Sequence, residues 1–268
     1  MNIGSTTHPL NTINASWGDI RMGAPVESIM GGYNDPRLDK YFLKATDPAV
    51  AGTFKGIRNG INIDAKARYL DYSSLAPLDS YIQLMTAAEV WFLRAEAAVR
   101  GWTGGGDAGT NYNNGIRQSF VQHKVEGTAD AYINNATAKP KPYIDPKAIT
   151  PGQNDVTTGP NLSTITIKWD NAAIREIKME RILTQKWIAM YPEGQEAWSE
   201  FRRTGYPKLF PVVINNSNGT ISTTDFIRRA VYPGTEYAVN GKAIEKAITT
   251  FQTPKDLGGT RLWWDVPR

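Results

Sequence analysis

Residues 181–211 read RILTQKWIAMYPEGQEAWSEFRRTGYPKLFP, and this stretch has the pattern of a helix, a tight turn and a second helix. Pro192 and Gly194 interrupt an apolar helical run, because proline lacks a backbone donor and glycine weakens a helix. Gly205 and Pro207 then end the second helix, since both types are common just beyond a helix C-terminus. The large apolar side chains here are Trp187, Ile188, Tyr191, Trp198 and Phe201. Two helices with this much apolar surface must pack against further parts of the protein.

Another helical hairpin is predicted within residues 83–126. Apolar residues recur at alternating spacings of four and three, at Leu84, Ala88, Trp91, Ala95, Ala98 and Trp102. After the turn GWTGGGDAGTN, Tyr112, Ile116 and Phe120 repeat every four residues. Because both runs have a helical period, we expect two helices that pack antiparallel through these faces.

The helix that precedes Pro192 is expected to begin near Asp170, a residue type that caps helix N-termini. Its apolar residues form two stripes, one of which contains Met179, Leu183, Trp187 and Met190. A helix with two apolar sides lies between neighbours, and with the helix after the turn it forms a predicted hairpin at 170–206. Two such hairpins are typical of tetratricopeptide-like units, which stack to bury their apolar faces.

The remaining segments are predicted to be irregular. Residues 1–82 contain Gly, Pro, Asn and Asp throughout, as functional loops commonly do. Residues 127–169 form an elaborated loop, in which LSTITIKW, residues 162–169, has the alternation of a short strand. Residues 207–268 form a C-terminal segment. We therefore expect a single, mostly α region with long irregular loops and a few short strands.

Several stretches of the chain resemble one protein family. They are GGYNDPRLDKYF at 31–42, LMTAAEVWFLRAEAAVRGW and YNNGIRQSF within 84–120, ERILTQKWIAMYPEGQEAWSEFRRTGYP at 180–207, and RLWWDVPR at 261–268. In this order, they are similar to the C-terminal region of the SusD/RagB family, the nutrient-binding outer-membrane lipoproteins of Bacteroidetes-type glycan-utilisation systems. The resemblance implies a SusD-like fold of tetratricopeptide-like helical hairpins.

The resemblance also implies a function. Proteins of this family are non-enzymatic; they capture an oligosaccharide at the cell surface and act as a lid on a SusC-like TonB-dependent outer-membrane transporter. We therefore expect an oligosaccharide ligand, this transporter as the protein partner, and a location at the surface of the outer membrane. Two alternatives stay open, namely capture of peptides, as in some family members, and a tetratricopeptide-like scaffold that binds only protein.

The beginning of the chain departs from the family pattern. Family members are about twice the size of one ordinary domain, begin with a secretory signal and carry a lipid-bearing cysteine just after it. This chain contains no cysteine, and its first residues, MNIGSTTHPLNTINASW, have no apolar core of signal-peptide length. We therefore expect a C-terminal portion of a longer protein, which meets the membrane only through a lipid anchor that this chain lacks.

Composition argues against several other classes of protein. The net charge of +4 is modest and the basic residues are spread among acidic ones, so nucleic-acid binding is not expected. Without cysteine there are no thiolate metal sites, and the two histidines, His8 and His123, have no partners at metal-ligand spacing. The glycine-rich GWTGGGDAG lacks the Lys-Ser/Thr of a phosphate-binding loop. We therefore expect neither a metal nor a cofactor.

Three carboxylates raise the question of catalysis. Glu193, Glu196 and Glu200 are close in sequence, and the last two share a helical face, so they could supply an acid and a base for glycoside hydrolysis. The structural interpretation is that they complement the helix dipole and pair with Arg202, Arg203 or Lys208. We favour the structural role and expect no catalytic residue, so a hydrolase stays the third choice.

Aromatic residues are the stronger functional candidates, because the C–H faces of sugar rings stack on aromatic rings while polar side chains bond the hydroxyls. The predicted ligand-binding residues are Trp17 beside Asn14 and Asp19, Tyr33 beside Asn34, and Tyr72. Each ring has an alternative structural role, packed beneath a loop. By resemblance, family members place ligand-facing aromatics partly before the DPRL-like run, which favours Trp17.

Other conspicuous residues are assigned to structure. Asp35 and Arg37 are expected to form a turn and an ion pair, because Pro36 restricts the backbone between them. Trp263 and Trp264 are expected to pack the C-terminus onto the helices. The tryptophans assigned to helical core faces are Trp91, Trp102, Trp187 and Trp198.

Overall fold

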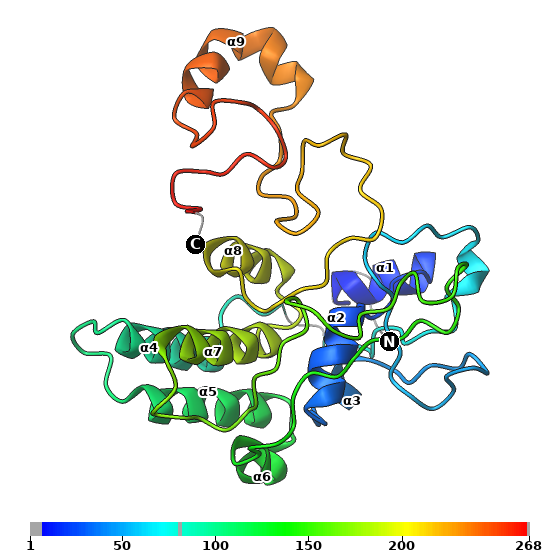
Figure 1. The fold of residues 1–268 in the computed structure, drawn as a ribbon, viewed down its shortest axis with the longest axis vertical. Helices are drawn as coiled ribbons and strands as arrows, with labels where there is room; N and C mark the ends of the chain where they lie inside the picture. The colour runs from blue at the N-terminus through cyan, green and yellow to red at the C-terminus, as the bar shows by residue number, and fades with distance from the viewer. Residues whose placement is uncertain (1–6, 80–81, 267–268) are drawn as a thin grey trace.

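The computed structural model describes residues 7–79 and 82–266, and its regular structure is helical (Figure 1). The α-helices are α1 (Pro9–Trp17), α2 (Ala24–Val26), α3 (Leu38–Tyr41), α4 (Ala87–Val99), α5 (Ala108–Gln122), α6 (Ala129–Ile133), α7 (Arg175–Ala189), α8 (Gly194–Thr204) and α9 (Gly234–Ile248). The π-helix Glu27–Gly31 continues α2, and two short 3-10 turns are Lys66–Arg68 and Glu126–Thr128. The mostly α fold with long irregular connections is confirmed, whereas the division into segments stays a prediction.

Helices α4, α5 and α7 pack together and form the centre of the core (Figure 1). Helix α5 contributes Tyr112, Ile116 and Phe120, which are completely buried as their four-residue spacing predicted. Phe92 of α4 faces this row and is also completely buried. Gly115 allows the close approach, because a Cβ atom there would lie 2.7 Å from the Phe92 ring. The first predicted pair of helices is therefore confirmed.

The boundaries of α4 are narrower than predicted. The helix begins after Thr86, whose hydroxyl accepts a hydrogen bond from the Glu89 amide, and it ends at Val99. Leu84 and Trp102 lie outside these bounds and are 90% and 65% exposed. Their assignment to an apolar helix face was wrong, because the spacing continues beyond the residues that are helical.

Helix α7 starts later than predicted, and α8 ends where predicted. Asp170 was the expected cap of α7, but its Oδ1 accepts from the Ala172 amide in a turn, and the helix begins at Arg175. The tight turn at Pro192 leads into α8, which stops at Gly205 with a left-handed φ of 71°. Helix α7 packs mainly against α4, and α8 meets α7 near the turn.

The predicted strand at 162–169 is wrong, because this segment is irregular. Ile165 and Ile167 insert into the core, which accounts for the apolar alternation. Their carbonyl oxygens accept hydrogen bonds from the hydroxyls of Tyr33 and Tyr112, at 3.3 and 2.7 Å. These two backbone acceptors are therefore satisfied without a partner strand. Within the described ranges, extended pairing is limited to isolated bridges such as Tyr143 with Val156.

The predicted ion pair between Asp35 and Arg37 is confirmed, and it lies in the core. Both side chains are fully buried, and Arg37 makes two hydrogen bonds to the Asp35 carboxylate, at 2.9 and 2.6 Å. Arg37 also donates to Ser119 of α5 and to Gln185 of α7. The motif that contains Pro36 therefore joins the N-terminal loops to the helical core.

The C-terminal segment crosses from α8 to α9 and returns to end near α8 (Figure 1). Trp264 packs against the Arg202 guanidinium of α8, at 4.9 Å from the ring centre, whereas Trp263 is 76% exposed. The prediction that both rings attach this terminus was wrong for Trp263, because its neighbour occupies the contact. Throughout the part of the chain that the structure describes, no helix combines the length and the apolarity needed to cross a membrane.

Candidate ligand-binding site

Helix α1 places Trp17 at its C-terminal end. The helix begins where the His8 ring accepts a hydrogen bond from the Leu10 amide, with Pro9 in its first turn. It ends at Gly18, which adopts a left-handed φ of 62° and donates its amide proton to the Asn14 carbonyl. Trp17 is therefore the last helical residue, and its side chain is 68% exposed. A broad aromatic surface is open to solvent at this point.

None of the α1 residues is fully buried, although Leu10 packs against the core, and polar contacts also hold the helix in place. The Asn11 side chain makes two hydrogen bonds to the Leu78 backbone, at 2.7 and 2.9 Å. Lys66 donates to the Trp17 carbonyl at 2.7 Å, and its ammonium nitrogen lies 3.8 Å from an Asp19 carboxylate oxygen. These contacts fix the end of the helix and place a cation and an anion beside Trp17.

A pocket of about 300 Å³ adjoins this end of α1. Its polar lining comes from Asp19, Arg21 and Lys66, and its apolar lining includes Ile63 and Leu70. The Arg21 guanidinium is oriented by hydrogen bonds to the carbonyls of Ile20 and Leu70. Carboxylate acceptors and cationic donors next to apolar side chains can bond hydroxyl groups and contact C–H surfaces at the same time.

Asn14 has a different environment from its two predicted partners. It lies one turn before Trp17 on α1 and is half-buried, whereas Asp19 is exposed. Its Oδ1 atom is covered and finds no hydrogen-bond partner among the described residues. In this conformation, Asn14 can therefore offer a ligand only the NH₂ donor of its side chain.

The prediction of exposed rings at Tyr33 and Tyr72 is wrong, because each ring is only 2% exposed. The Tyr33 hydroxyl donates to the Ile165 carbonyl, and the Tyr72 hydroxyl donates to Asp145 at 3.2 Å. Burial raises the pKa of both phenols well above the usual range, and both therefore stay neutral. These rings fill the core, because the irregular segments need apolar support beneath them as much as helices do.

Asn34 lies at a separate pocket of about 310 Å³, together with Pro36 and Lys141. It is exposed and adopts a left-handed φ of 52°, which asparagine tolerates better than most residues. Its place in the turn before the buried Asp35 explains the residue type without a ligand. The structure brings Trp17 and Asp19 together, with Asn14 one turn away, and assigns Asn34 to another pocket.

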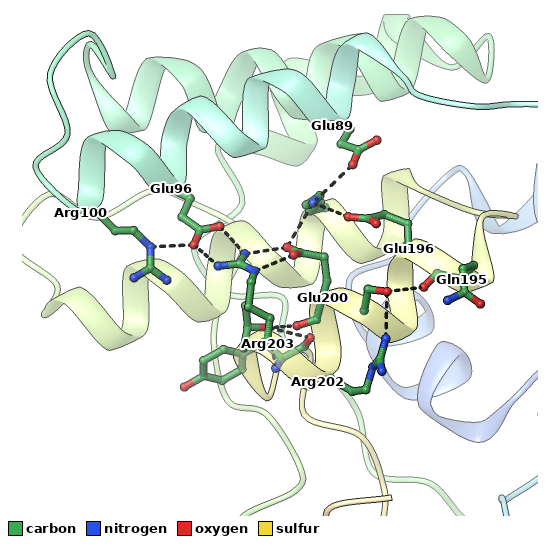
Figure 2. A network of polar contacts seen from close by, with 12 residues as sticks. Glu89, Glu96, Arg100, Gln195, Glu196, Glu200, Arg202 and Arg203 are labelled. Atoms are coloured by element: carbon green, nitrogen blue, oxygen red, sulfur yellow. Dashed lines mark hydrogen bonds and ion pairs between the residues drawn. The ribbon is translucent and has the colours of Figure 1, made fainter. Parts of the chain in front are cut away.

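Two of the three carboxylates considered for catalysis, Glu196 and Glu200, belong to an ionic network that joins α4, α7 and α8 (Figure 2). Lys186 of α7 is 1% exposed, and its ammonium nitrogen lies 3.5 Å from Glu89, 3.4 Å from Glu196 and 3.1 Å from Glu200. Figure 2 shows Arg203 between Glu96 and Glu200, with hydrogen bonds to both carboxylates. The expected pairing of Glu200 with Arg203 is confirmed.

Opposing effects determine the protonation of this network. Burial alone would raise the pKa of Glu200, but the hydrogen bond from Arg203 and the charge of Lys186 outweigh it and lower the pKa. For Glu89, burial prevails over Lys186 and the pKa is raised. These carboxylates already bind protein cations, which is the arrangement of a structural network.

The pocket residues Lys66 and Arg21 were missed at the sequence level. Lys66 lies 49 positions from Trp17, and no periodic pattern links them. Arg21 is close in sequence, but only the fold turns it towards the same pocket as Asp19. Across residues 7–79 and 82–266, no group of three or more acidic or histidine side chains is placed to hold a metal ion.

Comparison with known proteins agrees with this architecture. A sequence model of the family described as SusD and RagB outer membrane lipoproteins matches residues 1–265. A solved chitin-binding SusD homologue from Flavobacterium johnsoniae is 45% identical, with a TM-score of 0.89 over 98% of this chain and 53% of its own. A SusD-like protein from Bacteroides thetaiotaomicron is 40% identical, with a TM-score of 0.87 over 97% of this chain and 53% of its own.

A SusD homologue from Bacteroides vulgatus has 38% identity and a TM-score of 0.87, and the match covers 100% of this chain and 53% of the homologue. This chain therefore spans about half the length of these solved relatives. No functionally curated protein shows significant similarity to it.

Proposed function

Since this chain belongs to the SusD-like family of outer membrane lipoproteins, we propose that it binds an oligosaccharide at the cell surface. The observation that carries the proposal is the Trp17 ring, which is 68% exposed beside Asp19 and Lys66. A sugar ring can stack on the indole while these charged groups bond its hydroxyls. The chitin-binding relative from Flavobacterium johnsoniae supports a glycan as the ligand class.

Binding without catalysis is part of the proposal. Glu196 and Glu200, two of the three carboxylates considered for glycoside hydrolysis, are paired with Lys186 or Arg203 in the network between α4, α7 and α8. The pocket that adjoins the end of α1 offers one carboxylate, Asp19, together with the cations Arg21 and Lys66. We propose that the bound oligosaccharide is then delivered to a SusC-like TonB-dependent transporter, the partner that the family resemblance implies.

Substitution of the indole tests the proposal. Trp17→Ala removes one stacking surface, which is worth about 1–3 kcal/mol if base–aromatic stacking is taken as the analogue. The expected result is a loss of affinity of roughly fivefold to over a hundredfold, with an unchanged melting temperature. Calorimetric titration with chito-oligosaccharides and with a panel of bacterial, plant and host oligosaccharides measures it.

Trp102→Ala is the matched control, because Trp102 is also exposed, at 65%, and lies beyond the end of α4. This variant should bind glycans as the unmodified chain does. Equal affinities for Trp17→Ala and the unmodified chain would remove Trp17 from the site. Absence of glycan binding at millimolar concentration would place peptide capture ahead of glycan capture.

A further inference from the structure

Two neighbouring pockets share part of their lining, and together we call them the apolar groove. The smaller pocket, about 270 Å³, includes Phe42 and Tyr191 in its lining. The larger one, about 650 Å³, reaches Phe226. Both pockets share Trp187, Gly194 and Ala197, so the groove runs across the junction of α7 and α8.

The lining of the groove has little charge. Glu193 is the single charged residue that the smaller pocket draws from the described chain, and the larger pocket draws none. Two polar side chains of the larger pocket already have protein partners, because Asn215 donates to the Ile221 carbonyl and the Trp198 indole donates to the Ile227 carbonyl. The groove therefore suits an apolar occupant better than a glycan, whose hydroxyls need free partners.

The floor of the groove can accept a closely packed element. Gly194 and Ala197 are the two smallest lining residues, and a Cβ atom built on Gly194 would meet nothing within 4 Å. Trp187 of α7, which lines both pockets, packs against the core and is only partly buried. The other members of this α7 stripe, Met179, Leu183 and Met190, are buried, so Trp187 is the member that reaches the groove.

We infer that the groove binds an apolar segment from the other half of the SusD-like fold, whether that half is joined to this chain or separate. The solved relatives are about twice as long as the part that this chain matches, with 53% of their length covered. The part not matched must meet the matched part over an interface, and a mostly apolar groove at a helix junction is a surface that gains by being covered. The inference does not depend on the glycan proposal.

A second copy of this chain fits the groove less well. In a symmetric dimer the same surface of both copies meets, so one hollow would face another and leave a void between them. Complementary packing requires a protruding apolar surface in the partner, because an interface core is packed as densely as a protein interior.

The test uses a defined probe, namely the part of the Flavobacterium johnsoniae chitin-binding relative that lies outside the match. This segment is co-expressed with the full 268-residue chain, and the complex is measured by sedimentation and by titration calorimetry. We expect a one-to-one complex. Ala197→Arg places a charge on the floor of the groove and should weaken the complex at least tenfold.

Val239→Arg on α9 is the matched control, because Val239 is 79% exposed and lies outside the groove. A second groove variant, Ile214→Arg, guards against misfolding, since Ile214 is already 39% exposed in the wall. Circular dichroism must show native helix content for each variant. Trp17→Ala should leave the association unchanged, which separates this test from the glycan test.

Three outcomes would overturn the inference. One is the absence of a complex, or a complex that both groove variants leave intact. Another is self-association of the chain alone that Ala197→Arg abolishes, which would make a second copy the occupant. The third is binding of an oligosaccharide that the groove variants remove and Trp17→Ala does not.

Discussion

Helices α7 and α9 have the same length of 15 residues, but α7 buries ten of them and α9 buries one. Helix α7 lies between α4, α5 and α8, whereas α9 lies apart from the helical core (Figure 1). The lengths are therefore equal, and the difference in burial arises from neighbouring elements. Helix formation in a protein depends more on packing than on propensity, so the two helices should respond differently to mutation.

The charged residues of the two helices show the same contrast. Lys186 of α7 is buried among the carboxylates of α4 and α8, and Arg181 bonds the carbonyl of Thr166. In α9, the charged residues Glu236, Lys242, Glu245 and Lys246 are all exposed. A buried charge depends on its partners, while an exposed one is replaceable.

The largest expected effect is that of Lys186→Met. Removal of the ammonium leaves Glu89, Glu196 and Glu200 without their shared cation, and loss of one member of a buried ion pair typically costs 3–5 kcal/mol. We expect about 3 kcal/mol, the lower limit, because Glu196 is 44% exposed and Glu200 keeps Arg203. Urea unfolding measures the loss in free energy of unfolding. A loss below about 1 kcal/mol would contradict the interpretation that the network is buried.

An intermediate effect is expected from His123, which caps α5. Burial, followed by the charge of Arg37, lowers the pKa of His123 to about 4, and its Nε2 lies 3.1 Å from the Tyr41 hydroxyl. Tyr41 donates its proton to the Ile188 carbonyl of α7, so His123 is the donor in this contact. The unfolded chain binds a proton near pH 6.5 and the folded chain only near pH 4.

Stability should therefore fall as the pH is lowered from 6.5 towards 4, by about 1–2 kcal/mol after allowance for partial exposure of the ring. His123→Gln keeps a hydrogen-bond donor and should remove this slope. Unfolding between pH 6.5 and 5 measures the difference above the range of the carboxylates. Parallel pH profiles for the two proteins would show that His123 is not the titrating group.

The smallest effect is expected in α9. Lys242 is exposed, so Lys242→Met should change the free energy of unfolding by less than about 0.5 kcal/mol. The substitution is the same as at Lys186, and the two variants differ only in burial. A large loss at Lys242 would mean that α9 packs against a further element and would weaken the contrast between the two helices.

The helical core was largely predictable from the sequence, because Tyr112, Ile116 and Phe120 have the period of a helix and are all buried. The buried pair of Asp35 and Arg37 was predictable too, since Pro36 restricts the backbone between them. Helix ends were less accurate, as Leu84 and Asp170 show. The spacing of apolar residues does not show at which residue a helix is capped, and therefore does not show where the helix begins.

The candidate site was less predictable than the core. Trp17 was selected from its residue type and neighbours, and its exposure matches that choice, whereas Tyr33 and Tyr72 had similar neighbours and are buried. Irregular segments lack the periodicity that separates buried from exposed positions. The sequence therefore does not show whether a ring beside Asn or Asp in such a segment faces the core or the solvent. Whether it faces solvent depends on residues far away, such as Asp145 for Tyr72.

The sequence by itself determined the mostly α fold, the helices on either side of Pro192 and the family resemblance, because these depend on local periodicity, on helix breakers and on the order of motifs. Only the tertiary structure decided which rings are exposed, that Lys66 contacts Trp17 and which carboxylates surround Lys186. It also decided that α7 is buried and α9 is not. These properties arise from contacts between residues that are distant in sequence, and such contacts leave no local pattern.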